Sequence, residues 1–358
     1  MDKKLIYVNS YTGSGIGDFG RHIYDGLSKK VLDIKYVNTG EEWNDLYRVW
    51  KTILFSRDIV IFNIGFTSFG KSAIRNFLNF LMIFFRKKIL RRNNIIILHD
   101  SPDIINKNVS GYKLFFIMKL GGKIATRMMG GSHIIVFSEE LKNILNFKYN
   151  VKNVDFYPLP CITDFKPMFN IKSDNIKIIN IGYIAPYKGL EILPDIKKEV
   201  EKSDIKNIEF IVIGKPHKVL YNTDNGKEQI DILISMLKKS GINVPGYVPT
   251  QEVDNILKKD MCIALLPYKL VYGSSSSAIF FIERGIPVIT TNQKGFIKFK
   301  ELGAGLITFN TAHDLVEILR RLIVNKNEAM KLSNQNAEYC KKYNMNNFIN
   351  RLMELMQT

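Results

Sequence analysis

The sequence has few cysteines and no long apolar segment. Its three cysteines, Cys161, Cys262 and Cys340, are widely separated and odd in number, which argues against a disulfide framework or a zinc cluster. No apolar run reaches the roughly 20 residues that a membrane-spanning helix needs. Residues 1–13 also lack the apolar stretch and small-residue cleavage site of a secretory signal. We therefore expect a protein of the reducing cytoplasm.

Metal-binding patterns and repeats are missing as well. None of the five histidines shows the i, i+4 spacing of a zinc site. No Asp-any-Asp triplet is present to seat a divalent ion against a diphosphate. The absence of a fixed-period repeat or a long low-complexity tract excludes solenoids and linker-dominated chains. We expect chemistry that uses neither a metal ion nor another cofactor.

Positive charge is abundant. The 358 residues contain 51 Lys and Arg against 34 Asp and Glu, a formal net charge of +17, and 46% of them are hydrophobic. This length and hydrophobic content predict two domains, each with its own core. A basic surface can attract nucleic acid, anionic lipid or a phosphorylated small molecule. Because no nucleic-acid reading module or aromatic stacking platform is recognisable, we expect no nucleic-acid partner.

The densest cluster of positive charge lies at residues 76–92. An apolar stretch, NFLNFLMIFF, ends there in Arg86, Lys87, Lys88, Arg91 and Arg92. An apolar helix face that ends in cations is typical of peripheral contact with an anionic membrane. A buried helix with a solvated last turn has the same pattern, since cations also stabilise a helix C-terminus. Both interpretations stay open.

Short apolar strands alternate with amphipathic helices, which predicts parallel, doubly wound sheets. The predicted strands are Leu5–Asn9, Ile34–Val37, Ile59–Asn63, Ile95–Leu98, Ile134–Phe137, Lys177–Ile181, Phe210–Ile213, Cys262–Leu265, Val288–Thr290 and Leu306–Phe309. The predicted helices lie near 19–28, 44–53, 72–85, 139–147, 189–202, 227–239, 250–258, 275–284, 312–325 and 328–341.

A break in this alternation separates the chain into two halves. Residues 157–174 contain three prolines and show no clear period, which is typical of an interdomain linker. We predict an α/β protein with two Rossmann-like, doubly wound domains that face a central cleft. The expected N-terminal domain covers residues 1–165 and the C-terminal domain covers residues 166–342.

Two segments of the second half combine a buried strand with a turn suited to phosphate. The first, IINIGYIAPYKGLEIL at 178–193, supplies Lys188 at a helix start. A lysine there opposes the helix dipole unless an anion compensates it. The second, YGSSSSAIFFIERGIPVITT at 272–291, places small serines behind Gly273, where they would leave backbone N–H groups open to an anion. Together they predict a nucleotide diphosphate site, although serine is also common as a helix cap.

In the first half, a glycine-rich turn follows the first strand. Gly13, Gly15 and Gly17 precede a predicted helix, and glycine lets the backbone approach a ligand closely. The acidic ribose ligand of a dinucleotide site is missing, because the second strand is followed by Asn-Thr-Gly at 38–40. The turn predicts either a phosphate contact or a tight structural turn.

His99 and Asp100 end the fourth predicted strand, in the sequence IIILHDSPDI. A histidine at the tip of such a strand can donate to a sugar hydroxyl or shuttle a proton, because its pKa lies near neutrality. The alternative is a histidine that caps a neighbouring loop. Its position at the expected cleft favours the functional interpretation.

The order of these segments resembles the retaining GT-B glycosyltransferases, in particular glycosyltransferase family 4, also called glycosyl transferases group 1. The matching pieces are GSGIGDFG, LHD, SEE, NIGYIAPYKGLE, VIGKP, GYVPTQEVDNILKKDMCIALLPY and GSSSSAIFFIERGIPVITT. The resemblance covers nearly the whole chain. It implies a retaining hexosyltransferase that moves a sugar from a nucleotide-diphosphate donor to an acceptor such as a lipid-linked or cell-surface glycan precursor. Such an enzyme would work in the cytoplasm or at the inner face of the membrane.

The resemblance also implies roles for single residues. The C-terminal domain would hold the donor, the N-terminal domain would hold the acceptor, and a helix over 343–358 would cross back to the N-terminal domain. His99 and Lys188 would be catalytic, and Asp100 would bind the acceptor. The implied donor-binding residues are Gly15, Gly17, Tyr183, Lys188, Gly214, Lys215, Tyr247, Val248, Ser275, Ser276 and Ser277.

The sequence departs from the family pattern at three positions. Tyr183 stands where many members have an arginine, and Tyr272 and Phe280 stand where many have a pair of glutamates. Glu283 lies three residues further on and would face another side of its helix. The missing glutamates motivate an alternative, a non-catalytic GT-B protein that binds a sugar nucleotide or a partner enzyme. A GT-B epimerase would show more carboxylates near the cleft.

Overall fold

The structure is a computed structural model. It describes residues 4–10, 15–39, 43–66, 69, 73–100, 115–202, 205, 207–271 and 274–357. The chain divides into two compact units, which are described separately below. Unit 1 comprises Met1–Ile162 and Asn344–Thr358, and unit 2 comprises Thr163–Tyr343.

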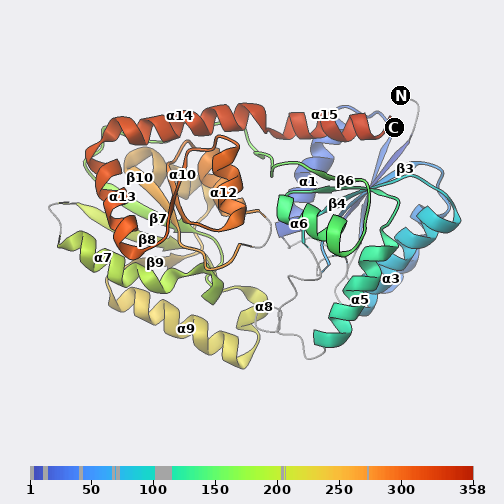
Figure 1. Cartoon of the computed structure of the whole chain (residues 1–358), viewed down its shortest axis with the longest axis horizontal. Helices are drawn as coiled ribbons and strands as arrows, with labels where there is room; N and C mark the ends of the chain where they lie inside the picture. Colours follow the sequence, from blue (N-terminus) through green and yellow to red (C-terminus); the bar gives the residue numbers. More distant parts are fainter. Residues whose placement is uncertain are drawn as a thin grey trace. The chain divides into compact units, whose positions relative to one another are not determined.

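Unit 1 is built on a parallel sheet of six strands in the order β2-β1-β3-β4-β5-β6. Its strands are β1 (Leu5–Asn9), β2 (Ile34–Asn38), β3 (Ile59–Ile64), β4 (Asn94–Leu98), β5 (His133–Val136) and β6 (Val154–Phe156). Its helices are α1 (Gly15–Ser28), α2 (Trp43–Leu54), α3 (Ala73–Phe84), η1 (Phe85–Ile89), α5 (Phe115–Met128), α6 (Glu139–Asn143), η3 (Ile144–Lys148) and α15 (Met345–Leu355). Figure 1 shows α3 beside α5, while α15 packs on α1.

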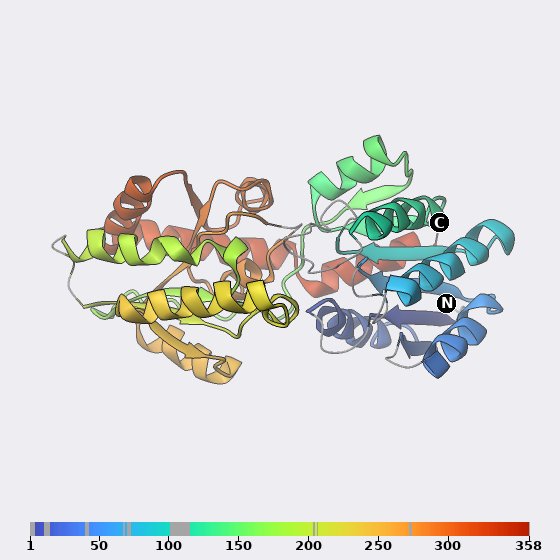
Figure 2. The ribbon, with the colours of Figure 1, turned by 90° about the horizontal axis from the view of Figure 1, so that it is seen from below.

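Unit 2 repeats this plan with a second parallel sheet, in the order β12-β11-β10-β7-β8-β9. Its strands are β7 (Ile176–Ile181), β8 (Ile208–Ile213), β9 (Asn243–Gly246), β10 (Met261–Leu266), β11 (Val288–Thr291) and β12 (Leu306–Phe309). Its helices are η4 (Pro186–Lys188), η5 (Leu190–Ile192), α7 (Leu193–Glu201), α8 (Lys218–Tyr221), α9 (Asp224–Lys239), α10 (Thr250–Lys259), α11 (Ser276–Ile282), α12 (Lys294–Glu301), α13 (Ala312–Val324) and α14 (Lys326–Lys342). Figures 1 and 2 show α7 and α9 on one side of this sheet and α14 on the other.

Each unit has its own apolar core. In unit 1, β1, β3, β4 and β5 contribute residues that are buried on both faces, and α2 and α3 pack against them. In unit 2, the inner strands β7 and β10 play the same part, and α7, α9 and α13 cover them. Strands buried on both faces read as continuous apolar runs, which is why the sequence reveals them. The predicted pair of Rossmann-like domains is confirmed.

The basic segment 76–92 differs from the sequence expectation at its centre. Arg86 is fully buried, and its guanidinium donates to the backbone carbonyls of Ile53 and Ser56 at 2.6 and 2.7 Å and to Asn94 Oδ1 at 2.9 Å. Burial lowers the pKa of Arg86 to about 10. Arg86 is therefore a structural residue that connects neighbouring segments inside unit 1, and it does not belong to a membrane-facing cluster. Lys88 and Arg91 are exposed.

A buried carboxylate ties the start of unit 2 to α11. Glu283 is 4% exposed, and its two oxygens accept from the backbone N and the hydroxyl of Thr163, each at 3.1 Å. Arg284 lies beside it, with Nη1 3.6 Å from Glu283 Oε2. Glu283 thus has a structural role in unit 2.

Candidate functional site

Each sheet contains a point where the chain reverses its direction of winding. In unit 2, β7 lies between β8 and β10, so successive connections leave it toward opposite edges of the sheet. Ligands of open α/β sheets bind at the carboxyl ends of two such strands. Lys188 follows β7, and Tyr268 follows β10. The sequence prediction of a site after β7 therefore points to the topological switch of unit 2.

The turn after β7 is held tightly against the end of β10. Gly189 has a φ of 67°, and a Cβ there would lie 1.9 Å from the carbonyl oxygen of Pro267. The backbone N of Lys269 donates to the carbonyl of Tyr187 at 3.0 Å. Only glycine allows this approach without displacing the backbone. The turn therefore fixes where Lys188 emerges.

Lys188 is a half-buried cation that lies on an aromatic ring. Its Nζ is 3.7 Å from the centre of the Tyr268 ring, a distance at which a cation is attracted to the ring face. Among the residues that the structure describes, no carboxylate pairs with it. Burial lowers the pKa of Lys188 to about 7. An anionic ligand would supply the missing counter-charge.

Three polar groups surround the Cα of Gly182, directly after β7. A Cβ built at Gly182 would lie 3.0 Å from Ser277 Oγ, 3.8 Å from Tyr268 Oη and 3.9 Å from Lys188 Nζ. These residues come from two different connections, yet the fold brings them together. The sequence analysis identifies Lys188 and Ser277 but misses Tyr268. The position of Tyr268 directly after β10 is the sequence feature that could have identified it.

The Tyr268 hydroxyl is buried and makes no hydrogen bond to the residues that the structure describes. Burial raises the pKa of Tyr268 to about 12. The hydroxyls of Ser277 and Ser275 lie near enough to oppose this rise in part, although neither forms a hydrogen bond of regular geometry with it. Leaving a buried hydroxyl unpaired costs about 1–3 kcal/mol, which a ligand that bonds to it would recover.

The serine run begins α11. Ser275 is its N-cap, and its Oγ accepts from the backbone N of Ala278 at 3.3 Å. The amides of Ser276 and Ser277 have no hydrogen-bond partner in the described part of the chain. First-turn amides of a helix suit an anion. Tyr272 and Gly273, which precede this run, lie outside the described residues.

The residues expected around the base lie after β8 and β9. Lys215 and Tyr247 are exposed, with Lys215 Nζ 4.5 Å from the centre of the Tyr247 ring. Gly214 donates its backbone N to the carbonyl of Gly246 at 2.8 Å, and Val248 is half-buried. The structure therefore brings these four predicted residues into one neighbourhood.

A histidine missed by the sequence analysis connects this neighbourhood to Lys188. The backbone N of His217 donates to the carbonyl of Ile184 at 3.0 Å, and its ring meets the ring of the exposed Tyr183 edge-on at 5.5 Å. Burial lowers the pKa of His217, and the nearby charge of Lys188 lowers it further. His217 is therefore neutral near pH 7 and does not compete with Lys188 for an anion.

In unit 1, the corresponding switch point lies between β1 and β3. Asn9 ends β1, Asn63 faces it in β3, and His99 follows β4. His99 Nε2 lies 2.7 Å from Asn63 Oδ1, and Asn9 Nδ2 donates to the carbonyl of Gly17 at 2.8 Å. Two predicted residues, Gly17 and His99, thus share one network with two asparagines that the sequence analysis misses.

The chemistry of His99 differs from one part of the expectation. Burial lowers the pKa of His99 to about 3, so the ring is neutral at physiological pH and is a poor proton shuttle. Asp100 is half-buried, and its Oδ1 accepts from the backbone N of Phe66 at 2.5 Å. Gly15 is exposed at the start of α1, whereas Gly13 lies outside the described residues.

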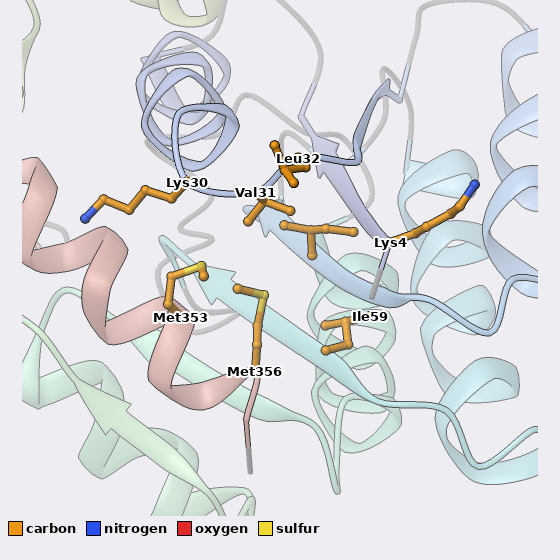
Figure 3. A pocket seen from close by; sticks show the side chains of 8 residues that line it. Lys4, Lys30, Val31, Leu32, Ile59, Met353 and Met356 are labelled. Carbon is orange, nitrogen blue, oxygen red and sulfur yellow. The ribbon is translucent and has the colours of Figure 1, made fainter. Parts of the chain in front are cut away.

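A cavity of about 100 Å³ lies at the opposite end of the unit 1 sheet, where β1 and β3 begin. Leu5, Ile59, Met353 and Met356 contribute to its apolar lining. Figure 3 shows the charged ends of Lys4 and Lys30 pointing away from it. This cavity is therefore separate from the residues identified above.

The same described ranges contain neither a metal-binding cluster nor a membrane-spanning helix. No group of three or more His, Cys, Asp or Glu side chains there is arranged to hold a metal ion. Within those ranges, none of the helices combines the length and the apolar composition that a membrane span requires.

Comparison with known proteins matches residues 162–339 to the family Glycosyl transferases group 1. No curated protein sequence matched the chain.

Solved structures resemble the chain more widely. Anabaena HepE, solved with UDP and glucose, has a TM-score of 0.67 at 12% identity, over 98% of this chain and 99% of that one. Sucrose-phosphate synthase from Thermosynechococcus elongatus has a TM-score of 0.70 at 11% identity, over 99% and 98%. A UDP-forming alpha,alpha-trehalose-phosphate synthase from Burkholderia xenovorans has a TM-score of 0.68 at 10% identity, over 99% of both chains. These similarities show a GT-B fold.

Proposed function

Residues 162–339 form a glycosyl transferases group 1 domain, and from this premise we propose that the chain transfers a sugar from a nucleotide-diphosphate donor to an acceptor. We place it in glycosyltransferase family 4, with retention of configuration at the anomeric carbon and a hexose as the transferred sugar. The donor would bind to unit 2 and the acceptor to unit 1. UDP and UDP-glucose are the first probes, because a solved neighbour was crystallised with them.

The observation that carries this proposal is Lys188. Its ammonium lies on the Tyr268 ring, and no carboxylate among the described residues pairs with it. The amides of Ser276 and Ser277, which begin α11, also have no partner among those residues. A cation and helix-start amides at a topological switch point are suited to phosphate groups. A diphosphate would satisfy both.

The same residues suit the chemistry of transfer. Cleavage of the bond between the sugar and the β-phosphate leaves additional negative charge on the departing diphosphate, which a protonated Lys188 would neutralise. A lysine and backbone amides can do this without a metal ion. Tyr183, Gly214, Lys215, Tyr247 and Val248 would surround the nucleoside.

Unit 1 would supply the remaining contacts. Gly15 and Gly17 would approach the donor phosphates through backbone, and His99 would contact the transferred sugar. Asp100 would bind the acceptor through an oxygen that does not accept from Phe66. In this proposal the acceptor would bind at the strand ends that also carry Asn9 and Asn63.

Donor selection and Lys188 can be tested in one series. A thermal-shift screen with uridine, guanosine and adenosine diphosphates and their sugars would identify the donor, since a ligand of the folded state raises Tm. Consumption of that donor would then be measured for the wild type and for Lys188→Ala. We expect Lys188→Ala to lower turnover by about 100-fold or more, with an unchanged far-UV circular dichroism spectrum.

Lys202→Ala is the matched control, because Lys202 is a surface lysine at the end of α7 that pairs with Glu199 at 2.6 Å. It should behave as the wild type. Wild-type turnover by Lys188→Ala would refute the proposed site. Failure of every diphosphate to raise Tm would refute the proposed donor class.

We further propose that the acceptor is lipid-linked, or lies close to an anionic membrane. On α3, Ile74 is 65% exposed, and on α5, Leu120 is 61% exposed. Exposed cations accompany them, Lys88 after α3 and Lys123 on α5. Exposed apolar and basic residues on two packed helices suit peripheral contact at the inner membrane face.

Vesicle co-sedimentation tests this contact. With vesicles that contain phosphatidylserine, the double variant Lys88→Glu and Lys123→Glu should release most of the bound protein, because each basic residue near such a surface contributes about 1 kcal/mol. Lys238→Glu and Lys239→Glu on α9 make the same charge change elsewhere and should have less effect. Arg86 must be left intact, since its replacement would test folding. Equal binding by all three proteins would refute the contact.

A second function, non-catalytic binding of a sugar nucleotide or a partner enzyme, is favoured by Phe280. This residue stands where many family members place a ribose-binding glutamate. The centre of its ring lies 3.6 Å from Cζ of Arg284, and Arg284 also pairs with Asp254 at 2.6 Å. A phenylalanine side chain cannot supply the carboxylate that holds a ribose. Binding of a donor without any consumption would support this function, and measurable turnover by pure protein would exclude it.

A further inference from the structure

Two fully buried asparagines connect the first turn of α1 to His99. Asn9 and Asn63 are each 0% exposed, and they face each other in the parallel register of β1 and β3. Both carry amides, which must be hydrogen-bonded when they are buried away from water. Their partners therefore determine how each amide is oriented.

Backbone carbonyls fix both orientations. Asn63 Nδ2 lies 2.9 Å from the carbonyl oxygen of Ile16, and Asn9 Nδ2 lies 2.8 Å from that of Gly17. A carbonyl can only accept, so the atom facing it must be the amide nitrogen. Asn63 Nδ2 also donates to Asn9 Oδ1 at 2.9 Å, which agrees with both assignments.

This orientation determines which nitrogen of His99 carries the proton. Asn63 Oδ1 is the remaining amide atom, and it lies 2.7 Å from His99 Nε2. An amide oxygen can only accept, so Nε2 must donate. In a neutral imidazole the other nitrogen, Nδ1, then has a lone pair and can only accept.

Nδ1 is the nitrogen that a ligand can reach. His99 is half-buried, and Nδ1 has no hydrogen-bond partner within the described residues. The rings of Phe19 and Phe137 hold the imidazole, with centroid distances of 5.5 and 5.1 Å. Burial among them keeps the pKa of His99 low, so the neutral form is the relevant one.

A close helix approach makes the network possible. A Cβ at Gly20 of α1 would lie 1.9 Å from Asn9 Oδ1 and 2.3 Å from Asn63 Nδ2. Any larger residue would push α1 away from the asparagines, and the carbonyls of Ile16 and Gly17 would move with it. The glycines near the start of α1 therefore have two uses. They allow the hydrogen bonds to Asn9 and Asn63, and they let the backbone approach a ligand.

We propose that Asn63 is a positioning residue that fixes His99 as the Nε2–H tautomer and leaves Nδ1 to accept a hydrogen bond from a substrate hydroxyl. The identity of that substrate as a sugar rests on the proposed function above. The consequence is a rule of specificity. A sugar is recognised at this point only if it presents a hydroxyl that can donate, and a fluorinated or O-methylated position cannot.

The tautomer can be observed directly in the full-length protein. Long-range ¹H–¹⁵N correlation spectra of ¹⁵N-histidine-labelled protein distinguish Nε2–H, Nδ1–H and imidazolium rings, and His99→Gln assigns the signals of His99 among the five histidines. We expect a single Nε2–H tautomer at neutral pH. An Nδ1–H ring, an imidazolium or a mixture of tautomers in the wild type would overturn the proposal, without reference to any variant.

Two substitutions test the role of Asn63. Asn63→Leu removes the acceptor and should release His99 into a mixture of tautomers, while kcat/KM for the identified donor falls by about 10-fold or more. Asn63→Asp keeps an acceptor for Nε2–H and adds a negative charge, so His99 should become an imidazolium at a higher pH than in the wild type. Retention of a pure Nε2–H ring in Asn63→Leu would overturn the proposal.

Asn79→Leu is the matched control. Asn79 is 1% exposed in the same unit and donates to the carbonyl of Phe69 at 2.6 Å, so its loss reports general destabilisation. It should leave the His99 signals unchanged. The spectra do not depend on a donor, which separates the two proposals: an Nε2–H ring in a protein that binds no nucleotide would support the role of Asn63 and refute only the proposed function.

Discussion

The two topological switch points of the molecule are built in opposite ways. In unit 1, the buried amides of Asn9 and Asn63 bond to each other and to the backbone, and they leave one ring nitrogen of His99 open. In unit 2, among the residues that the structure describes, no carboxylate pairs with Lys188 and no group bonds to the buried hydroxyl of Tyr268. The asparagine amides of unit 1 have their hydrogen bonds before any ligand binds, whereas Lys188 of unit 2 lacks an anion.

This difference indicates a division of work. A satisfied network holds a side chain in one state at little cost in stability, which suits orientation of a sugar. Unpaired polar groups destabilise the free protein and are stabilised by the ligand, which suits tight binding of a charged group. We therefore expect substitutions in unit 2 to change donor binding strongly, and substitutions in unit 1 to act in a different way.

The largest effect is expected from Gly189→Ala. The new Cβ would lie 1.9 Å from the carbonyl of Pro267, at a residue with φ of 67°, so the turn that carries Lys188 must move. We expect both a lower Tm and the loss of donor-dependent stabilisation in thermal-shift assays. Gly303→Ala is the control, because Gly303 has a φ of 94° but nothing within 4 Å of a Cβ. This substitution should lower the free energy of unfolding by about 1 kcal/mol and leave donor binding intact. Intact donor binding by Gly189→Ala would contradict the role of the turn.

The next largest effect is on the pH dependence of donor binding. The pKa of Lys188 in the free protein is lowered to about 7, and a bound diphosphate favours the charged ammonium. Below this pH the lysine is already protonated, whereas above it binding requires proton uptake. Kd should therefore rise with pH, by up to tenfold per pH unit above about 7.

Calorimetric titration in buffers of different ionisation enthalpy would measure this proton uptake. Lys188→Arg provides the control, because a guanidinium stays charged across the range, and its Kd should vary little with pH. His217 is neutral in the same range, since burial and the charge of Lys188 both lower its pKa. A pH-independent Kd for the wild type would contradict the account of Lys188.

The smallest effect is expected from Tyr268→Phe. The ring under Lys188 remains, while the unpaired buried hydroxyl is removed. The free protein should be more stable by about 1 kcal/mol, measured by urea unfolding. Donor affinity should fall if the ligand bonds to that hydroxyl. Tyr268→Leu, which also removes the ring, should weaken donor binding further. Destabilisation of the free protein by Tyr268→Phe would show that the hydroxyl already has a partner.

Much of the fold can be predicted from the sequence, because parallel strands buried on both faces form short apolar runs that alternate with helices. The edge strands β6 (VDF) and β9 (NVPG) are not predicted, since they are short and contain polar or proline residues. Helix α5 is also missed, because Gly121 and Gly122 interrupt its apolar pattern. Segment 76–92 shows that local pattern cannot separate a buried arginine from an exposed one.

The residues of the candidate site also form two groups, those that sequence reasoning finds and those that it misses. Lys188, His99 and the serine run follow strands and carry local signals, so sequence reasoning finds them. Tyr268 and Asn63 act through partners that are distant in the chain: the Asn9–Asn63 bond spans 54 positions and the Asn63–His99 contact spans 36. Such pairs depend on strand order, which no local pattern specifies.

The central claim is that Lys188 holds the diphosphate of a donor, and a comparison of two ligands tests it most directly. Calorimetry would measure the Kd of the nucleoside diphosphate selected by thermal shift, and of its parent nucleoside, for the wild type and Lys188→Ala. We predict that Lys188→Ala weakens diphosphate binding by about 10-fold or more and leaves nucleoside binding unchanged. Equal diphosphate affinity in the two proteins would contradict the claim.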